Sequence, residues 1–260
     1  YLSAISPDRS GDIAERYAFS DSRVKVIRQH NQGLGFARNT GLQRASGDYV
    51  GFVDSDDWVD EGMYQSLLEL AKSTQSDAVY SGLRLVSPDG SARVIEHPFS
   101  GRTLSGQSEI RMLQRYFYGG APEVCSAIYN RDFLIRNNLL FDRACHYEDG
   151  FFNIFVCQKA HRISMSSYVY YNYRKDGQSS ITSSFDQSSL SDTLTVFSDL
   201  LQMARSESPE EYARVCLNHA SRTVQAGSRS LIFKILQSSL SNSDKRLLMN
   251  KINRSRVLLD

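Results

Sequence analysis

The stretch Gly47–Trp58, which reads GDYVGFVDSDDW, points most directly to the architecture of this chain. Its apolar part, Tyr49–Val53, does not alternate with polar residues. Such a run is typical of a strand that is buried on both faces of a parallel sheet. The run stops at Asp54, where an acidic turn begins. Ligands of open α/β sheets bind outside the carboxyl ends of strands, so we expect a binding site at this turn.

The sequence on either side of this stretch alternates between strand and helix patterns. We expect strands over residues 23–28, 78–86, 125–130 and 163–174, and helices over residues 36–45, 61–72, 133–138 and 146–159, with a further helix from Arg111 onward. This order predicts an α/β sheet with right-handed crossovers. After residue 183 the chain becomes serine-rich but remains periodic, so we expect two domains, an α/β domain at 1–183 and a helical subdomain at 184–260.

Composition excludes several classes of protein. The chain has 260 residues, of which 41% are apolar and 23% are charged, so it is neither disordered nor collagen-like. Thirty basic and 29 acidic residues give a net charge of +1, which argues against a partner that is nucleic acid. The four cysteines form no CxxC motif, and we expect free thiols in a reducing compartment.

The acidic turn predicts a metal site. Asp54, Asp56 and Asp57 place three like charges together, which is costly unless a cation neutralises them. Mg²⁺ and Mn²⁺ prefer oxygen ligands and usually share them with the phosphates of a substrate. We therefore expect a clamp that holds a metal ion and a diphosphate. The alternative is a solvated turn in which Asp57 or Asp60 caps the next helix.

Three further motifs have both a functional and a purely structural interpretation. The segment Asn31–Asn39 has glycines and an arginine at a helix start, which suits either a phosphate-binding loop or a plain turn. The pair Glu148 and Asp149 suits either a general base or a helix N-terminus. Finally, Tyr170–Arg174, with the hydroxyl groups of Ser179–Thr182 beyond it, suits either a lid that closes on phosphates or an aromatic edge strand.

Together these motifs resemble bacterial family 2 glycosyltransferases. The resemblance covers residues 6–182, and the run Asn31–Trp58 is its most specific part. It implies the GT-A fold, which is a Rossmann-like α/β fold with a mixed, mainly parallel sheet flanked by helices. It also implies an inverting transfer of a sugar from a nucleotide-sugar donor, with a UDP-sugar expected, to a glycan or lipid-linked acceptor.

The resemblance also implies roles for individual residues. Asp54-Ser55-Asp56 matches the DxD motif, with Asp56 as the direct ligand of Mn²⁺ or Mg²⁺ and with Asp54 and Asp57 in support. Asp149, next to Glu148, matches the general base. The nucleotide pocket is expected to include the following residues: Asn31, Gly33, Arg38, Asp54, Asp56, Arg174 and Ser179.

The chain departs from the family pattern near its start. Relative to that pattern, the first strand, a helix and strand segment and the aspartate that reads uracil are not in this sequence, since Ile5 runs straight into Ser6. We expect that these residues are omitted from the sequence rather than deleted from the protein, because a sheet without them would leave open edges. The first residue is Tyr1 rather than Met, so a targeting segment is not excluded.

The C-terminal helices carry a strong positive charge. Residues 222–260 contain eight basic and two acidic side chains, so their local charge is 8 − 2 = +6. This charge suits either a solvated face or peripheral contact with an anionic membrane from the cytoplasmic side, and apolar residues such as Leu231 suit a homodimer. The competing functions are a nucleotidyltransferase and a catalytically inactive glycan- or nucleotide-binding module.

Overall fold

The computed structural model of the chain describes residues 2–4, 8–118, 124–141 and 148–175, and the single residues 242 and 246. The helices are α1 (Ser10–Ser20), α2 (Leu34–Arg44), α3 (Met63–Thr74), α4 (Gln107–Tyr118), α5 (Arg131–Arg136) and α6 (Glu148–Lys159), with a 3₁₀ turn at Val124–Ser126. The strands are β1 (Leu2–Ala4), β2 (Ile27–Gln29), β3 (Tyr49–Gly51), β4 (Trp58–Val59), β5 (Ala78–Val86), β6 (Ala92–Ile95), β7 (Thr103–Ser105), β8 (Ala127–Asn130) and β9 (Arg162–Arg174).

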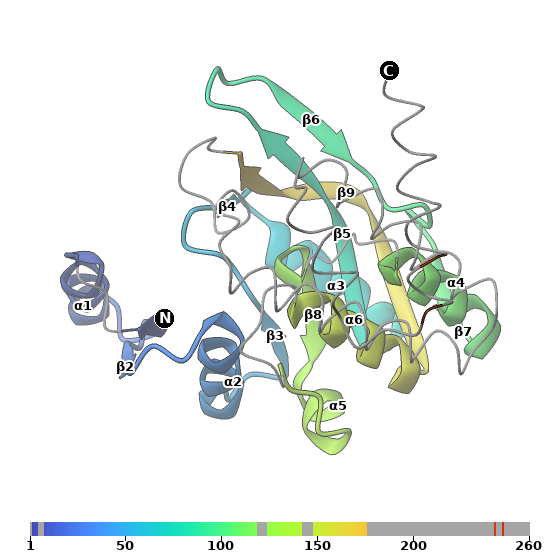
Figure 1. Ribbon diagram of the computed structural model, residues 1–260, viewed down its shortest axis with the longest axis horizontal. Coiled ribbons are helices and arrows are strands. Elements are labelled where there is room, and N and C mark those ends of the chain that lie inside the picture. Colours follow the sequence, from blue (N-terminus) through green and yellow to red (C-terminus); the bar gives the residue numbers. More distant parts are fainter. Residues whose placement is uncertain are drawn as a thin grey trace.

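Seven of these strands form one mixed sheet in the order β3-β8-β5-β9-β4, with β6 paired to β5 and β7 paired to β9 (Figure 1). The long strands β5 and β9 run parallel at its centre. The other pairs in this sheet are antiparallel. The mixed α/β fold with flanking helices is thus confirmed, and antiparallel pairing has a large share in it.

The core lies on both faces of the central strand β5, whose side chains alternate between the two faces with the period of a strand. Ala78 and Tyr80 belong to a cluster with residues of α4 and α6. Val79 and Leu83 belong to a second cluster with residues of α3. Helices therefore cover the sheet on both sides, and the acidic turn lies in the connection between β3 and β4, the two ends of the strand order.

The expectation for β3 is wrong in one respect. Its side chains alternate, with Val50 buried between a half-buried Tyr49 and an exposed Gly51, so the strand is not buried on both faces. The strand also lies at one end of the strand order, since β3 bonds antiparallel to β8 and has no other partner among the described strands. A side chain at position 51 would require Tyr64 to move, since an added Cβ would lie 2.7 Å from the Tyr64 ring.

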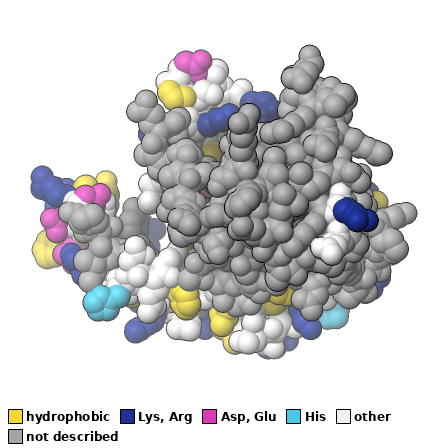
Figure 2. Space-filling view, in the orientation of Figure 1, with side chains coloured by type: hydrophobic (Ala, Val, Ile, Leu, Met, Phe, Trp, Pro, Cys, Tyr) yellow, Lys and Arg dark blue, Asp and Glu magenta, His cyan; other side chains and the backbone are white. Residues whose placement is uncertain are grey.

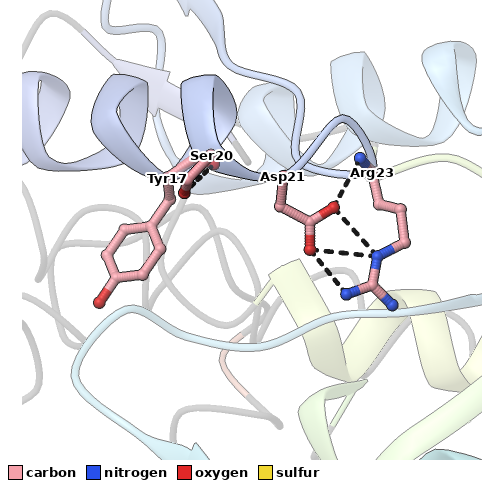
Figure 3. Close-up of polar contacts among 4 residues, drawn as sticks. All are labelled: Tyr17, Ser20, Asp21 and Arg23. Carbon is pink, nitrogen blue, oxygen red and sulfur yellow. Dashed lines mark hydrogen bonds and ion pairs between the residues drawn. The ribbon is translucent and has the colours of Figure 1, made fainter.

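The first described residues form a separate β-α-β unit. Strands β1 and β2 pair parallel to each other, and α1 connects them at one end of the molecule. Figure 3 shows how α1 ends: Ser20 Oγ donates to the Tyr17 carbonyl at 3.0 Å, and the Asp21 carboxylate accepts from the backbone and side chain of Arg23. The hydrogen bonds from Arg23 lower the pKa of Asp21 to about 2. Figure 2 shows charges of both signs gathered on this unit.

Several expectations concern residues outside the described part of the chain. They are the junction between Ile5 and Ser6, the loop from Ser179 to Thr182, the boundary at residue 183 and almost all of the helical subdomain at 184–260. Within the described residues, no helix combines the length and the apolar character needed to cross a bilayer.

Burial of His97 predicts a pH-dependent stability. The side chain is 5% exposed, and burial lowers its pKa from 6.5 to about 4, while a backbone contact with Ser81 partly opposes the shift. In the unfolded chain the same histidine gains a proton below its ordinary pKa. The unfolded state therefore binds more protons as the pH falls from 6.5 toward 4, and the free energy of unfolding decreases over that window.

We expect the free energy of unfolding of the wild-type protein to fall by about 2 kcal/mol from pH 7 to pH 5 because of His97 alone. His97→Phe, which keeps an aromatic ring beside Tyr80 and Tyr116, should remove that part of the pH dependence. Urea unfolding at both pH values measures it, with the exposed His30→Gln as the control. An equal pH dependence in His97→Phe and wild type would contradict the prediction.

Candidate active site

The acidic turn lies between β3 and β4. It is closed by a backbone bond from the Asp57 amide to the Asp54 carbonyl at 3.1 Å. Phe52, just before the turn, is buried against Phe141 and Phe152, so the entry to the turn is fixed by the core. Asp54 and Asp57 are half-buried and Asp56 is exposed. The alternative interpretation, in which Asp57 or Asp60 caps the next helix, is wrong in this respect, since the N-cap of α3 is Gly62 and carries no side-chain bond.

Arg38 supplies positive charge to the turn from α2. Its side chain is only 8% exposed, and its Nη2 lies 2.8 Å from Asp54 Oδ1. Its guanidinium also lies 5.3 Å from the ring centroid of Phe141. An arginine buried to this extent keeps its charge and needs an anionic partner. The predicted site residues Arg38 and Asp54 are therefore brought together by the fold, although they lie 16 residues apart.

Strand β9 holds the turn from the other side. Tyr171 Oη donates to Asp57 Oδ2 at 2.7 Å and accepts from the Asp54 amide at 3.2 Å. The Arg174 amide donates to Asp57 Oδ1 at 2.8 Å. Burial raises the pKa of Asp57, the two hydrogen bonds oppose that rise, and the charges of Asp56 and Asp54 add to it. Burial likewise raises the pKa of Tyr171 far above its ordinary value, so Tyr171 remains a hydrogen-bond donor.

The side chain of Arg174 braces the turn near Asp56. Its Nε donates to the Asp56 carbonyl at 2.9 Å, and its guanidinium lies 5.4 Å from the Trp58 ring centroid. The described residues offer no hydrogen bond or ion pair to the Asp56 carboxylate, which projects from an exposed position. Asp56 is therefore the member of the acidic turn whose oxygens are most available to a ligand from solution.

Asp149 is the second residue of α6 and is half-buried. Its Oδ1 accepts from the Gly150 amide at 2.9 Å. A negatively charged side chain in the first turn of a helix is stabilised by the helix dipole. Glu148 begins the helix, and its side chain lies outside the described part of the structure.

The predicted nucleotide-loop residues have local roles in the start of α2. Asn31 Oδ1 accepts from the Gly33 amide at 3.0 Å, and Gly33 is the N-cap of the helix. Its φ of 97° lies in the left-handed region that favours glycine. Both residues are exposed. Ser179 lies outside the described residues.

Sequence patterns do not mark three residues that bear on the candidate site: Tyr171 and Cys125 beside the turn, and Asn39 in α2. Tyr171 was noted only as part of a tyrosine-rich strand, and Asn39 only as part of a motif. Cys125 was expected only as a free thiol, and it is buried and free of a disulfide. Its Sγ and carboxylate oxygens of Asp54 and Asp57 lie within 4.8 Å of one another. No local sequence signal marks these contacts, because they join segments that are distant in the chain.

Known proteins share both the sequence pattern and the fold. A family model described as glycosyl transferase family 2 matches residues 5–137. EpsJ of Bacillus subtilis (strain 168), described as an uncharacterized glycosyltransferase, is 38% identical over 180 residues, which are 67% of this chain and 51% of EpsJ. The minor teichoic acid biosynthesis protein GgaB of the same organism is 27% identical over 180 residues, which are 68% of this chain and 19% of GgaB.

The crystal structure of S. aureus TarS 1–349 in complex with UDP-GlcNAc has a similar fold, with a TM-score of 0.64 at 18% identity, covering 98% of this chain and 82% of that chain. The mixed sheet of this chain, with its flanking helices and the acidic turn that follows a strand, is thus a glycosyltransferase domain of the GT-A fold. The chain belongs to glycosyl transferase family 2, whose model covers residues 5–137 of its 260. It spans about half the length of EpsJ.

Proposed function

We propose that this chain catalyses an inverting transfer of a sugar from a nucleoside diphosphate donor, with a UDP-sugar preferred, to a hydroxyl group of a glycan or lipid-linked acceptor. The observation that carries this proposal is the acidic turn, which is fixed by Arg38 and β9 while the Asp56 carboxylate remains exposed. The UDP-GlcNAc in the TarS complex supports the donor class. The name of GgaB supports an acceptor in surface polysaccharide or glycoconjugate synthesis.

The turn also fits a divalent cation. The turn has three carboxylates. The Arg38 guanidinium pairs with Asp54, and the Arg174 guanidinium bonds the Asp56 carbonyl, which leaves a local charge of −3 + 2 = −1 when all are ionised. Carboxylate oxygens are the ligands that Mn²⁺ and Mg²⁺ prefer. We propose Asp56 as the direct ligand, supported by Asp54 and Asp57. When bound, the cation would stabilise the negative charge that develops on the leaving diphosphate.

The protein's own groups perform the remaining steps. Asp149 accepts the proton of the acceptor hydroxyl as the bond to the sugar forms, and it needs only to be ionised at neutral pH. Arg38 neutralises charge beneath the turn and keeps Asp54 oriented. Arg174 fixes the backbone at Asp56 and places a second positive charge beside the turn. Holding donor and acceptor in one site contributes orientation.

Calorimetric titration of UDP in the presence of Mn²⁺, and then of EDTA, tests the donor and cation together. Binding that requires Mn²⁺ is the expected result, and a screen of UDP-sugars would follow. GDP and dTDP serve as competitors that test the preference for uridine. Failure of all three nucleotides to bind in Mn²⁺ would overturn the proposed function.

Asp56→Ala is expected to weaken UDP binding in Mn²⁺ at least tenfold, which corresponds to about 1.4 kcal/mol. The reason is the loss of the most available carboxylate of the turn. Asp89→Ala is the matched control, because Asp89 is also an exposed turn aspartate and, among the described residues, bonds Ser91 alone in the β5–β6 hairpin. If Asp56→Ala bound UDP with an unchanged dependence on Mn²⁺, Asp56 would not be the metal ligand.

A further inference from the structure

One side chain of α2 ties down a distant backbone segment. Asn39, next to Arg38, donates from Nδ2 to the Phe141 carbonyl at 2.6 Å and accepts at Oδ1 from the Phe141 amide at 2.9 Å. Both polar backbone groups of Phe141 are thereby satisfied by a single side chain, which lies 102 residues away in the sequence. A pair of bonds of this kind fixes the position and the orientation of the segment that it holds.

The ring of Phe141 then connects the two halves of the candidate active site. It is 1% exposed and stacks on Phe152 of α6 at 4.2 Å with an interplanar angle of 5°. It meets the ring of Phe52, two residues before Asp54, edge-on at 5.3 Å. The Arg38 guanidinium lies 5.3 Å from its centroid. Phe141 therefore contacts the support of the acidic turn and the helix that carries Asp149.

The charges on the two sides also share a neighbour. Tyr129 is fully buried, and its hydroxyl donates at 2.9 Å to Asn153, which lies one helical turn after Asp149 in α6. Burial raises the pKa of Tyr129. The hydrogen bond with Tyr80 acts to lower this pKa and Cys125 to raise it, and smaller contributions come from Arg38, which lowers it, and Asp149, which raises it. Both charges thus lie within electrostatic reach of one buried hydroxyl group. Any shift of α6 relative to α2 would change the placement of Asp149 relative to Arg38 and Asp54.

We propose that Asn39 is a positioning residue, which fixes Phe141 and thereby sets the location of Asp149 relative to the acidic turn that holds the donor. This role rests on the proposed function, and it adds to it a residue that touches neither substrate. A catalytic group displaced by 1 Å costs about 100-fold in rate. The effect should therefore appear in catalysis and not in binding of the nucleotide.

Asn39→Ala tests the proposal. We expect kcat for sugar transfer to fall about 10- to 100-fold, while the Kd of UDP in Mn²⁺ stays within about twofold of wild type. Hydrogen exchange should quicken at Phe141 and in the first turn of α6. Asn39→Asp retains an acceptor for the Phe141 amide but loses the donor, so its kcat should be intermediate between those of Asn39→Ala and wild type.

Asn137→Ala is the matched control. The side-chain amide of Asn137 also donates to a backbone carbonyl, that of Phe133 at 2.9 Å. This bond is local, because Phe133 lies in α5 and Asn137 is the C-cap of the same helix. The variant should reproduce any general loss of stability without the loss of kcat. Equal kcat values in Asn39→Ala and Asn137→Ala, after correction for the folded fraction, would show that Asn39 is only a structural tie. A loss of kcat accompanied by an equal loss of UDP affinity would also overturn the positioning role.

The outcomes separate this proposal from the one on which it rests. An active wild-type enzyme whose rate is insensitive to Asn39→Ala would reject the positioning role and leave the proposed function intact. A wild-type protein that binds UDP but transfers sugar from no UDP-sugar would reject the proposed function, and the positioning role with it.

Discussion

Asp149→Asn is expected to lower kcat for sugar transfer by about 10²- to 10⁴-fold, which is the usual contribution of a general base. The amide cannot accept the proton of the acceptor hydroxyl. The substitution keeps the shape of the side chain and an oxygen that can still accept from the Gly150 amide. The start of α6 should therefore be preserved, and the rate change should report on proton transfer alone.

The measurement is kcat at saturating donor, together with calorimetric titration of UDP and a thermal melt. UDP binding and the melting temperature should stay close to wild type. Asp132→Asn is the control, since Asp132 lies in the first turn of α5, is 76% exposed and is paired only loosely with Arg131 at 3.7 Å. If activity, UDP binding and stability all fell together in Asp149→Asn, Asp149 would be a structural part of the helix start.

The second large effect is expected at Arg38. Arg38→Met keeps an unbranched apolar chain against Phe141 but removes the charge that pairs with Asp54. Removing one partner of a buried ion pair leaves the charge of the other partner without an opposite charge. Because the Asp54 side chain is 27% exposed, we expect a loss at or just below the lower end of the range for buried pairs, about 2 to 3 kcal/mol in the free energy of unfolding.

Urea unfolding in the absence of nucleotide measures this loss. The control is Arg23→Met, which breaks an ion pair with Asp21 at the surface, where solvent screens the interaction. Its unfolding midpoint should lie close to that of wild type. Equal stability of Arg38→Met and wild type would mean that Asp54 does not depend on Arg38, and the acidic turn would then be held by β9 alone.

The parts of the fold that were predicted from sequence are those with buried apolar periodicity. Strand β5 was predicted with its observed bounds, and α6 was predicted to within two residues, because each packs a strongly apolar segment into the core. Strand β6 was missed since most of its side chains are exposed, which leaves no alternating pattern. Helix α1 was missed for a similar reason, since only Gly11 and Ala14 are buried.

The sequence predicts which kind of site to expect, but it does not predict the contacts that organise the candidate site. Acidic residues after an apolar strand are visible within one short stretch, and so is the arginine in the helix before it. The contacts that organise them join residues far apart in sequence, such as Tyr171 with Asp57 and Asn39 with Phe141. The packing of α2, α6 and β9 determines which residues come into contact. The spacing of residues along the sequence does not predict this packing.

The stacking of Arg174 on Trp58 also gives the protein a built-in optical reporter. Trp58 is the single tryptophan of the chain, it is 40% exposed, and it immediately follows the acidic turn. A cation or nucleotide that alters this turn would change the polarity and the charge beside the indole. Its emission can therefore follow binding and loop rearrangement in the unlabelled protein, on the millisecond scale of a stopped-flow instrument, with no competing tryptophan signal to subtract.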